Sequence, residues 1–357
     1  MVDATAISLT NPLFARPYLL DSQGSQQLAT TVGFDPVALE DKCVHQVYDL
    51  IATEFSSTRH SPWPAVLDFL REQPAGAFGA DLGCGNGKHL VAAAQLTMKQ
   101  SEAIAGESLP ASSSRKQELT VPYQSEPGIH QSCLSLAPML ALDRSTRLTH
   151  IVRERGFDVV VGDILRLPYV ANRLDFFLCI AVIHHLSTME RRLQAVIELA
   201  RLLRPNGRGL IQVWAKEQHD PRSDQPTRYL RKQRSSGEQS NVCTSPNLIF
   251  QEPVQNAVLP IHISGTEFPA TDMLVPWKQK QRKVNNPSPT DNQLVDKQRS
   301  DEGSCQPEAP GRYYHLFVQG ELDALVRHVP SLRTERSFYE QGNWAVIVVK
   351  IDEHKEV

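Results

Sequence analysis

Apolar positions along this chain change their spacing from one segment to the next, and the spacing separates predicted helices from predicted strands. Between Val44 and Phe55 apolar residues recur at intervals of three and four, as in an amphipathic helix. A Pro-Trp-Pro sequence follows, and Ala65–Gln73 predicts a second helix. Within Ala77–Leu90 the pattern predicts a short strand, a glycine-rich turn and a helix that begins near Lys88.

The same alternation resumes after a polar gap and continues to the C-terminus. The later strands are predicted at Pro138–Asp143, Phe157–Val161, Leu174–Leu186 (which runs into a loop) and Gly209–Ala215. Helices are predicted at Arg147–Arg155, Glu190–Leu203 and Glu321–Val329. Strands that alternate with helices indicate βαβ units, so we predict an α/β fold with a doubly wound, mainly parallel sheet that ends in an antiparallel strand pair.

Long polar segments without a sustained period interrupt this pattern. We predict a disordered N-terminal arm over residues 1–40 and a single domain over 41–357. Flexible insertions are predicted at about 97–135, 219–270 and 278–310. Loops of this length are uncommon in compact domains, but the apolar segments on either side continue one alternation, so surface insertions are the simplest interpretation.

Composition is that of an ordinary globular protein: of 357 residues, 41% are hydrophobic and 22% are charged. The net charge of −3 provides no overall positive field, so any nucleic-acid binding must use local patches. Candidates are the basic runs Arg228–Arg234 and Lys278–Lys283, with Arg191 and Arg192 at the start of a predicted helix. These cations either contact phosphates through counterion release or are simply solvated.

Six cysteines are scattered through the chain without a C-x-x-C pair. That distribution argues against a zinc site in this chain and against a disulfide framework, and it suits a reducing compartment. No apolar run approaches the roughly 20 residues that span a bilayer, and the N-terminus lacks the features of a secretory signal. We therefore expect a location in the cytoplasm or the nucleus, no membrane partner and no bound metal.

The strongest chemical signal is the sequence DLGCGNG at residues 81–87. A predicted strand ends at Asp81, and Gly83, Gly85 and Gly87 allow the backbone to turn tightly against a ligand at the carboxyl edge of the sheet. The acidic residue precedes the glycines, where it can hold a cationic amino group. There is no G-x-G-x-x-G sequence and no P-loop lysine spacing, so a dinucleotide is disfavoured. The alternative is a glycine turn that binds nothing.

Acidic residues also follow the next two predicted strands. Asp143 ends the second strand, where a carboxylate can accept both hydroxyls of a ribose, although a lone aspartate there usually caps a helix. Asp163 follows the third strand and can accept from an adenine amino group. Three acidic strand ends in order after a glycine turn form a stronger signal than any one of them.

This ensemble resembles the class I S-adenosylmethionine-dependent methyltransferases, whose fold is a seven-stranded Rossmann-like sheet. Several segments resemble one family within them, the fungal and animal tRNA wobble-uridine carboxymethyl methyltransferases. The glycine motif is shared by the whole superfamily. The more specific segments are FSSTRHSPWP (55–64), IHHLST (183–188), VPW (275–277) and YYHLF (313–317). The departures from the family are an insertion before the second strand and longer spacers around VPW, which put substrate-loop geometry in doubt.

The resemblance implies S-adenosyl-L-methionine as cofactor and the carboxylate of 5-carboxymethyluridine, in the tRNA anticodon loop, as the methyl acceptor. The cofactor-binding residues it implies are Asp81, Gly83, Cys84, Gly85, Gly87, Asp143, Asp163, Ile164 and Val182. Because a carboxylate is already ionised at pH 7, the site needs no strong base and must instead align and partly desolvate the oxygen.

Four residues are candidates for this alignment. Arg59 has a planar fork that suits the substrate carboxylate, although it would equally suit the carboxylate of the cofactor or lie on the surface. His184 and His185 lie beside the expected methyl position, where we expect one to face the substrate base and the other to pack. Trp214 could stack on the uridine or belong to the core.

A partner is implied by the predicted edge strand Phe157–Val161, which is too apolar to be left in water. Members of the resembled family use a small zinc-binding activator subunit along this edge, and any zinc would then belong to that partner. The alternative is that residues 97–135 cover the strand. Two other functions stay open: a methyltransferase acting on a small carboxylic acid, and a regulatory relative that keeps the fold without catalysis.

Overall fold

The computed structural model describes residues 19–20, 26–27, 35–74, 76–106, 139–231, 259–277 and 311–352. The chain forms two compact units, Met1–Asp35 with Ile249–Val258 and Pro36–Leu248 with Leu259–Val357. In the first unit β1 (Leu19–Leu20) and β2 (Gln26–Gln27) pair antiparallel. The second unit contains all the other described helices and strands.

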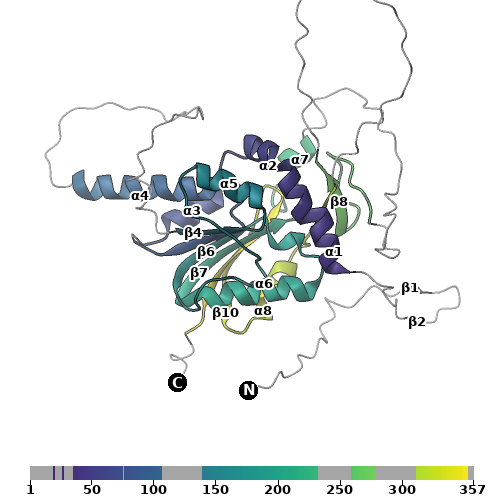
Figure 1. Cartoon of the computed structure of the whole chain (residues 1–357). Helices are drawn as coiled ribbons and strands as arrows, with labels where there is room; N and C mark the ends of the chain where they lie inside the picture. The colour runs from purple at the N-terminus through teal and green to yellow at the C-terminus, as the bar shows by residue number, and fades with distance from the viewer. Residues whose placement is uncertain are drawn as a thin grey trace, which may run out of the picture. The chain divides into compact units, whose positions relative to one another are not determined.

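A seven-stranded sheet with the order β10-β11-β7-β6-β3-β4-β5 forms the centre of the second unit (Figure 1). Its strands are β3 (Gly79–Leu82), β4 (Met139–Asp143), β5 (Val160–Val161), β6 (Leu174–Ile180), β7 (Leu203–Trp214), β10 (Leu332–Glu340) and β11 (Asn343–Lys350). The strands from β7 to β5 are mutually parallel, and β11 and β10 are antiparallel. The prediction of a doubly wound, mainly parallel seven-stranded sheet is confirmed.

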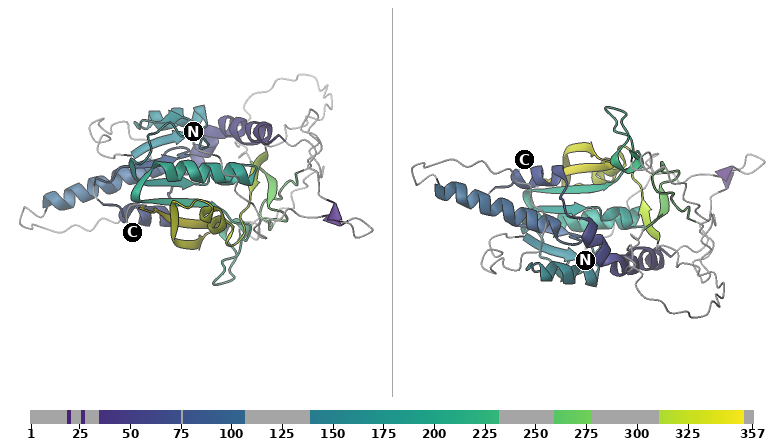
Figure 2. Two further views of the ribbon diagram at one scale, coloured as in Figure 1. Left: turned by 90° about the horizontal axis from the view of Figure 1, so that it is seen from below. Right: turned by 90° about the horizontal axis from the view of Figure 1, so that it is seen from above.

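Helices cover both faces of this sheet (Figure 2). The α-helices described in this unit are α1 (Pro36–Glu40), α2 (Gln46–Thr58), α3 (Pro64–Arg71), α4 (Lys88–Gly106), α5 (Thr146–Glu154), α6 (Met189–Leu202), α7 (Arg228–Arg231) and α8 (Glu321–Arg327). Consecutive β6 residues point to opposite faces, so Phe176 packs with Phe69 of α3, whereas Phe177 packs in the core formed with α6 and α8. The helices α4 and α5 cover the α3 side through Leu90 and Val152.

A small second sheet lies beyond the carboxyl ends of the parallel strands. It pairs β8 (Asp272–Pro276) with β9 (Gly311–His315) in antiparallel register, and a bridge from Ala215 to Phe317 joins the segment after it to the end of β7. The residues Met273, Tyr313 and Tyr314 are buried. The VPW and YYHLF segments, far apart in the sequence, are thus neighbours, and they lie where a ligand site is expected.

Several predicted boundaries were wrong. Pro36–Glu40, assigned to the disordered arm, forms α1 because Glu40 has a buried ion-pair partner far along the chain. The helix α4 continues to Gly106, into the segment assigned to the first insertion. The predicted strand Phe157–Val161 is a strand only at Val160–Val161, and β7 begins at Leu203 instead of Gly209. Residues 107–138, 232–258 and 278–310, which make up most of the predicted insertions, lie outside the described residues.

Candidate active site

The glycine turn after β3 borders a cavity of about 200 Å³. Gly83, Gly85 and Gly87 have φ angles of 91°, 56° and 76°. A Cβ atom on Gly83 would lie 2.2 Å from Cγ2 of Val182, so no side chain fits there. The amides of Gly83 and Cys84 both donate to the carbonyl of Leu142, at 2.7 and 2.9 Å, which ties the turn to the end of β4. The turn is therefore fixed at the carboxyl ends of two parallel strands, next to the strand-order reversal between β3 and β6.

Most of the predicted site residues meet in the wall of this cavity. Those that line it are Arg59, Gly83, Cys84, Gly85, Asp143, Asp163, Ile164, Val182, His184, His185 and Trp214. The two exceptions are Gly87, which faces Val152 of α5, and Asp81. Asp81 is fully buried beneath the turn, and neither of its carboxylate oxygens has a hydrogen-bond partner among the described residues. A buried carboxylate in this state can hold a cationic amino group.

The Asp143 carboxylate is held by two backbone donors at the end of β4. Gly85 N donates to Oδ2 at 2.7 Å, and Ser145 N donates to Oδ1 at 2.9 Å. Burial raises the pKa of Asp143 to about 6, although these two hydrogen bonds act in the opposite direction. The remaining lone pairs can accept from a vicinal diol such as a ribose.

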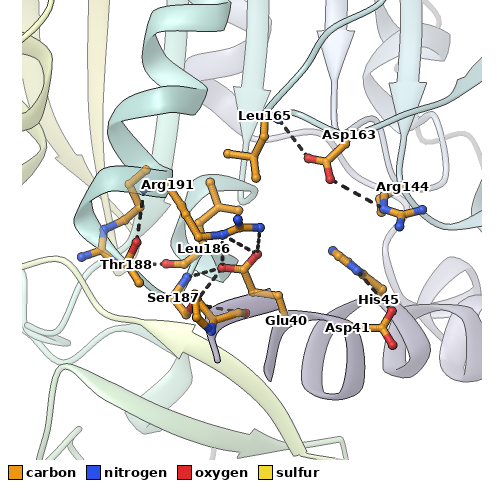
Figure 3. Close-up of polar contacts among 12 residues, drawn as sticks. Glu40, Asp41, His45, Arg144, Asp163, Leu165, Leu186, Ser187, Thr188 and Arg191 are labelled. Carbon is orange, nitrogen blue, oxygen red and sulfur yellow. Dashed lines mark hydrogen bonds and ion pairs between the residues drawn. The ribbon is translucent and has the colours of Figure 1, made fainter. Parts of the chain in front are cut away.

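Asp163 follows β5, the strand next to β4, and it lines the cavity across from the N-terminal helical segment that carries His45 (Figure 3). Its Oδ1 accepts from Leu165 N at 2.9 Å, and Arg144 Nε lies 3.9 Å from its Oδ2. His45 lies across the gap from this pair, at the end of the π-helix η2 (Asp41–His45) that follows α1. With Ile164, these residues line one part of the cavity, where apolar side-chain atoms and the acceptor oxygens of Asp163 suit an adenine ring.

The two histidines of the IHH helix η4 (Ile183–His185) have different roles. His185 Nδ1 donates to the carbonyl of Tyr313 at 2.7 Å, so its Nε2 accepts from the hydroxyl of Tyr48 at 2.9 Å. Both nitrogens of His185 are thus engaged. His184 Nδ1 accepts from Trp214 N at 3.0 Å, so its Nε2 carries the hydrogen, and that atom has no partner among the described residues.

Both histidine rings are buried, and burial is the main reason that their pKa values are low. The pKa of His185 falls to about 3, and that of His184 lies well below its ordinary value, where the nearby charge of Arg312 acts in the same direction. Both are therefore neutral at pH 7. The expectation that one histidine packs and the other faces a ligand fits this division, with His185 as the packed one.

Trp214 belongs to a group of aromatic rings at the far end of the cavity. It stacks on Tyr314 with ring centroids 4.6 Å apart and planes 17° apart, and Phe268 and Tyr229 each lie 5.9 Å from it. One face of the Trp214 ring is thus occupied by Tyr314 from β9. Trp214 and Tyr314 line the cavity together, so the site offers an apolar, aromatic wall to a planar ligand.

Cations line the cavity between the glycine turn and this aromatic wall. Arg59 and Arg312 lie over the same ring, Trp277, with guanidinium carbons 5.5 and 4.9 Å from its centroid. Lys88 Nζ lies 5.6 Å from the centroid of Trp63. None of the three forms an ion pair with a carboxylate within the described part of the chain.

Sequence reasoning missed most of this wall. Arg312, Tyr314, Lys88 and Tyr48 all line the cavity, and none of them was a predicted site residue. The available signals were position and motif: Lys88 directly follows the glycine motif, and Arg312 precedes the YYHLF segment. What could not be seen was that β9 returns to the ends of the parallel strands.

Hydrogen bonds among Glu40, Ser187 and Arg191, a cluster that we call the clasp, connect the N-terminal helix α1 to the loop beside the site (Figure 3). Glu40 is 1% exposed and accepts from the amide and hydroxyl of Ser187, at 2.7 and 2.8 Å, and from Arg191 Nη2 at 2.6 Å. Arg191 therefore holds α1, and Arg192 is buried, where it donates to the carbonyl of Leu186. The suggestion that this arginine pair meets phosphates was wrong.

Comparison with known proteins supports a methyltransferase. A family model described as a methyltransferase domain matches residues 127–211. A Schizosaccharomyces pombe tRNA (carboxymethyluridine(34)-5-O)-methyltransferase is 32% identical, over 88% of this chain and 99% of its own length. The Saccharomyces cerevisiae protein of the same name is 30% identical, over 87% of this chain and 96% of its own.

Other relatives are longer. A Xenopus tropicalis protein named as the same methyltransferase is 35% identical over 94% of this chain, and this chain spans 46% of its length. The chain therefore covers about half of the animal relatives but nearly all of the yeast proteins. On the strength of these full-length matches, the seven-stranded sheet and the glycine turn, the chain belongs to the tRNA (carboxymethyluridine(34)-5-O)-methyltransferase family and uses S-adenosylmethionine as its cofactor.

Proposed function

We propose that this protein transfers a methyl group from S-adenosylmethionine to the carboxylate of 5-carboxymethyluridine at the tRNA wobble position, which yields the methyl ester. One observation supports this most directly. A cradle formed by the glycine turn, Asp143 and Asp163 lines the same cavity as a wall of aromatic rings and of cations that have no ion-pair partner among the described residues, and the buried Asp81 lies beneath that turn. The cradle suits a cationic nucleoside cofactor, and the wall suits a planar base that carries an anion.

The residues of the cradle have distinct parts in this proposal. Asp81 holds the amino group of the cofactor, Asp143 accepts from the ribose hydroxyls, and Asp163 with Ile164 binds the adenine. Gly83, Cys84, Gly85 and Gly87 shape the backbone, with Val182 packed against the turn. The Asp81 carboxylate is the strongest support, because it is buried and neither oxygen accepts a hydrogen bond in the described structure, where His89 Nδ1 lies 3.4 Å from Oδ2. A ligand amino group would supply the missing hydrogen bonds.

The chemistry asks little of the protein beyond positioning. Bound S-adenosylmethionine supplies an electrophilic methyl group. The acceptor carboxylate is ionised at pH 7, so no residue has to remove a proton. Neutral His184 and His185 fit this requirement, since neither serves as a charged acid at pH 7. Buried walls exclude water from the acceptor oxygen, and the cations and Trp214 orient it toward the methyl group.

Two alternatives use the same site. A small carboxylic acid would find the same cations, although the aromatic wall would then lack a base to stack on. A regulatory relative would keep the cofactor site and would not catalyse methyl transfer. Binding of tRNA is not explained by Arg191 or Arg192, and the runs Arg228–Arg234 and Lys278–Lys283, largely outside the described residues, stay candidates for phosphate contacts.

The test is methyl transfer to tRNA from cells that lack this enzyme activity. Purified protein is incubated with S-adenosylmethionine and that tRNA, and digested nucleosides are quantified by mass spectrometry. We expect 5-carboxymethyluridine to be converted to its methyl ester, with no comparable transfer to free carboxylic acids. Transfer to the free acids alone would favour the first alternative, and none to either acceptor, with an activator subunit present, would favour the second.

We also propose a small zinc-binding activator subunit as a partner, docked on the edge strand β5, and the cytoplasm or nucleus as the location. Support for the partner is the position of β5 at the end of the sheet, with Val160 and Val161 41% and 39% exposed. Part of the predicted apolar patch is not available, because Val159 is buried and Phe157 packs against the same cluster. The segment 107–138, which could cover the strand instead, lies outside the described residues.

A further inference from the structure

We infer that the site sorts two carboxylates with separate cations: Arg312 binds the carboxylate of the substrate and selects it over a carboxamide, whereas Lys88 binds the carboxylate of the cofactor. This inference rests on the proposed function, since that reaction brings two carboxylates into one cavity. Arg312 is then a specificity-determining residue, and it was not among the residues predicted from the sequence.

Arg312 is a buried cation without a counter-ion. It is 5% exposed, lines the cavity, and has no carboxylate partner among the described residues. Its Nη1 donates to the Tyr314 hydroxyl at 2.7 Å, but its buried Nε has no acceptor in the described structure. A guanidinium removed from water in this way needs an anion to offset the cost of burial.

A directed chain of hydrogen bonds holds Arg312 in place. Arg312 donates to the hydroxyl of Tyr314, which lies 3.5 Å from that of Tyr48, and Tyr48 donates to His185 Nε2 at 2.9 Å. His185 in turn donates to the carbonyl of Tyr313 on the same strand, β9, at 2.7 Å. The guanidinium can only donate, and the neutral His185 ring accepts at one nitrogen and donates at the other, so the direction of the chain is set and it holds the guanidinium before any ligand arrives.

The cations form a series from the cofactor side to the substrate side. Burial, and then the positive charge of Arg59, lower the pKa of Lys88 to about 8. Burial lowers the pKa of Arg59 as well, and the charge of Arg312 acts in the same direction. Arg59 and Arg312 also share contact with the Trp277 ring, whereas Lys88 lies over a different ring, Trp63.

The ends of this series face different groups. Lys88 begins α4 directly after the glycine turn and lines the cavity there, on the side that the proposed function assigns to the amino acid end of the cofactor. Arg312 and His184 both line the cavity next to Tyr314: the Arg312 guanidinium donates to the Tyr314 hydroxyl, and the His184 ring lies 4.9 Å from the Tyr314 ring. His184 also has its Nε2–H without a partner among the described residues. On the substrate side, Arg312 and His184 therefore each present an N–H donor, and neither of these two groups presents an acceptor there.

The pair of donor groups on Arg312 and His184 distinguishes a carboxylate from a carboxamide. Both carboxylate oxygens accept hydrogen bonds, whereas the amide NH₂ would face donors and leave the arginine without an anion. A charged hydrogen bond of this kind contributes roughly tenfold or more in affinity, and a site that leaves a buried group unpaired rejects the analogue more strongly. The protein should therefore reject 5-carbamoylmethyluridine, which has the same shape.

The first experiment uses the unmodified protein with S-adenosylhomocysteine bound. Affinities for the free nucleosides 5-carboxymethyluridine and 5-carbamoylmethyluridine are measured by equilibrium titration. We expect the carboxylate to bind at least about tenfold more tightly. Equal affinities would overturn the inference. This measurement needs no methyl transfer, so it separates a failure of the inference from a failure of the proposed function.

The second experiment uses matched variants. Arg312→Gln should abolish the preference between the two nucleosides with the affinity for S-adenosylmethionine within about twofold of the parent, and Arg312→Lys should keep part of it, because a charge remains without the fork. Lys88→Met should weaken cofactor binding at least about tenfold and keep the preference. Arg71→Gln, at an exposed ion pair on α3, is the control and should change neither.

Two results would overturn the assignment. One is a retained carboxylate preference in Arg312→Gln, and the other is loss of the preference in Lys88→Met with cofactor affinity unchanged. Should Arg312→Gln fail to fold, Arg312→Lys is decisive: a full preference in that variant, with a normal thermal transition, contradicts a role for the fork and a reduced preference supports it.

Discussion

The Asp81 carboxylate is the residue whose environment makes the least sense without a ligand. It is fully buried, its oxygens accept no hydrogen bond in the described structure, and the imidazole Nδ1 of His89 lies 3.4 Å from its Oδ2. We expect Asp81→Ala to lower the affinity for S-adenosylmethionine at least about tenfold, measured by calorimetry, because the cofactor's amino group loses its only anion. Unchanged affinity would refute this assignment.

Asp143 should make cofactor binding depend on pH. Its pKa is raised to about 6 by burial, so its ribose-accepting form is lost as the pH falls through 6. We expect affinity for S-adenosylmethionine to decline below pH 6 by up to about tenfold per unit, and Asp143→Asn to remove that dependence.

The decline cannot be attributed to unfolding through this group. A raised pKa in the folded state means that folded protein binds the proton more tightly, so protonation of Asp143 adds stability as the pH falls through 6. Calorimetry at several pH values, beside a melting curve at each, separates the two effects. A flat affinity between pH 5 and 8 would contradict the role of Asp143.

At the scale of single residues, local sequence was a good guide to the cofactor side and a poor one to the substrate side. Asp81, Asp143 and Asp163 each end or follow a strand, so the parallel sheet alone predicts that they meet. Arg312 reaches the cavity only because β9 pairs with β8, a contact that no local pattern encodes. His184 and His185 were identified as a pair, but only the hydrogen bonds distinguish them.

Among the secondary-structure elements, α1 has the strongest influence on the position of the cavity wall. Glu40 at its end is buried against Ser187 and Arg191, and the η2 segment that follows contributes Val44 and His45 to the cavity wall. Because Glu40 is bonded to Ser187, the position of Val44 and His45 in the cavity wall depends on the loop that follows the IHH helix. The sequence predicted disorder here, because a five-residue helix whose partner lies 151 residues away has no local signal.

Glu40→Gln tests whether the clasp keeps the cavity closed. The amide can accept some of the hydrogen bonds, but the buried ion pair is lost, and breaking such a pair costs about 3 kcal/mol of unfolding free energy. We expect that loss in urea denaturation, with faster dissociation of S-adenosylmethionine in stopped-flow measurements. Arg71→Gln, which breaks an exposed pair, should cost less than about 1 kcal/mol. A stability loss without faster dissociation would mean that the clasp is structural alone.

At the scale of the whole molecule, the order of strands in the sheet determines which strand lies at the edge and exposes apolar side chains. The order was predictable, because strands alternating with helices admit few parallel arrangements, and the edge position of β5 followed from it. The extent of the exposed patch was not predictable, because it depends on Val159 packing under α5. What remains exposed is Val160 and Val161, two adjacent β-branched residues with free backbone groups on one side.

Such an edge makes the isolated chain prone to association, and a bound subunit would relieve this. We expect the chain expressed alone to be poorly soluble or inactive, and co-expression with the small zinc-binding subunit to restore both properties. Replacing Val160 and Val161 by threonine keeps the strand propensity, so it should raise the solubility of the isolated chain and weaken subunit binding at least about tenfold. Pull-down and sedimentation with the purified subunit measure this, with Val170→Thr, an exposed valine outside the strand, as control. Full activity of the isolated parent chain would remove the need for a partner, and unchanged binding by the double variant would place that partner elsewhere.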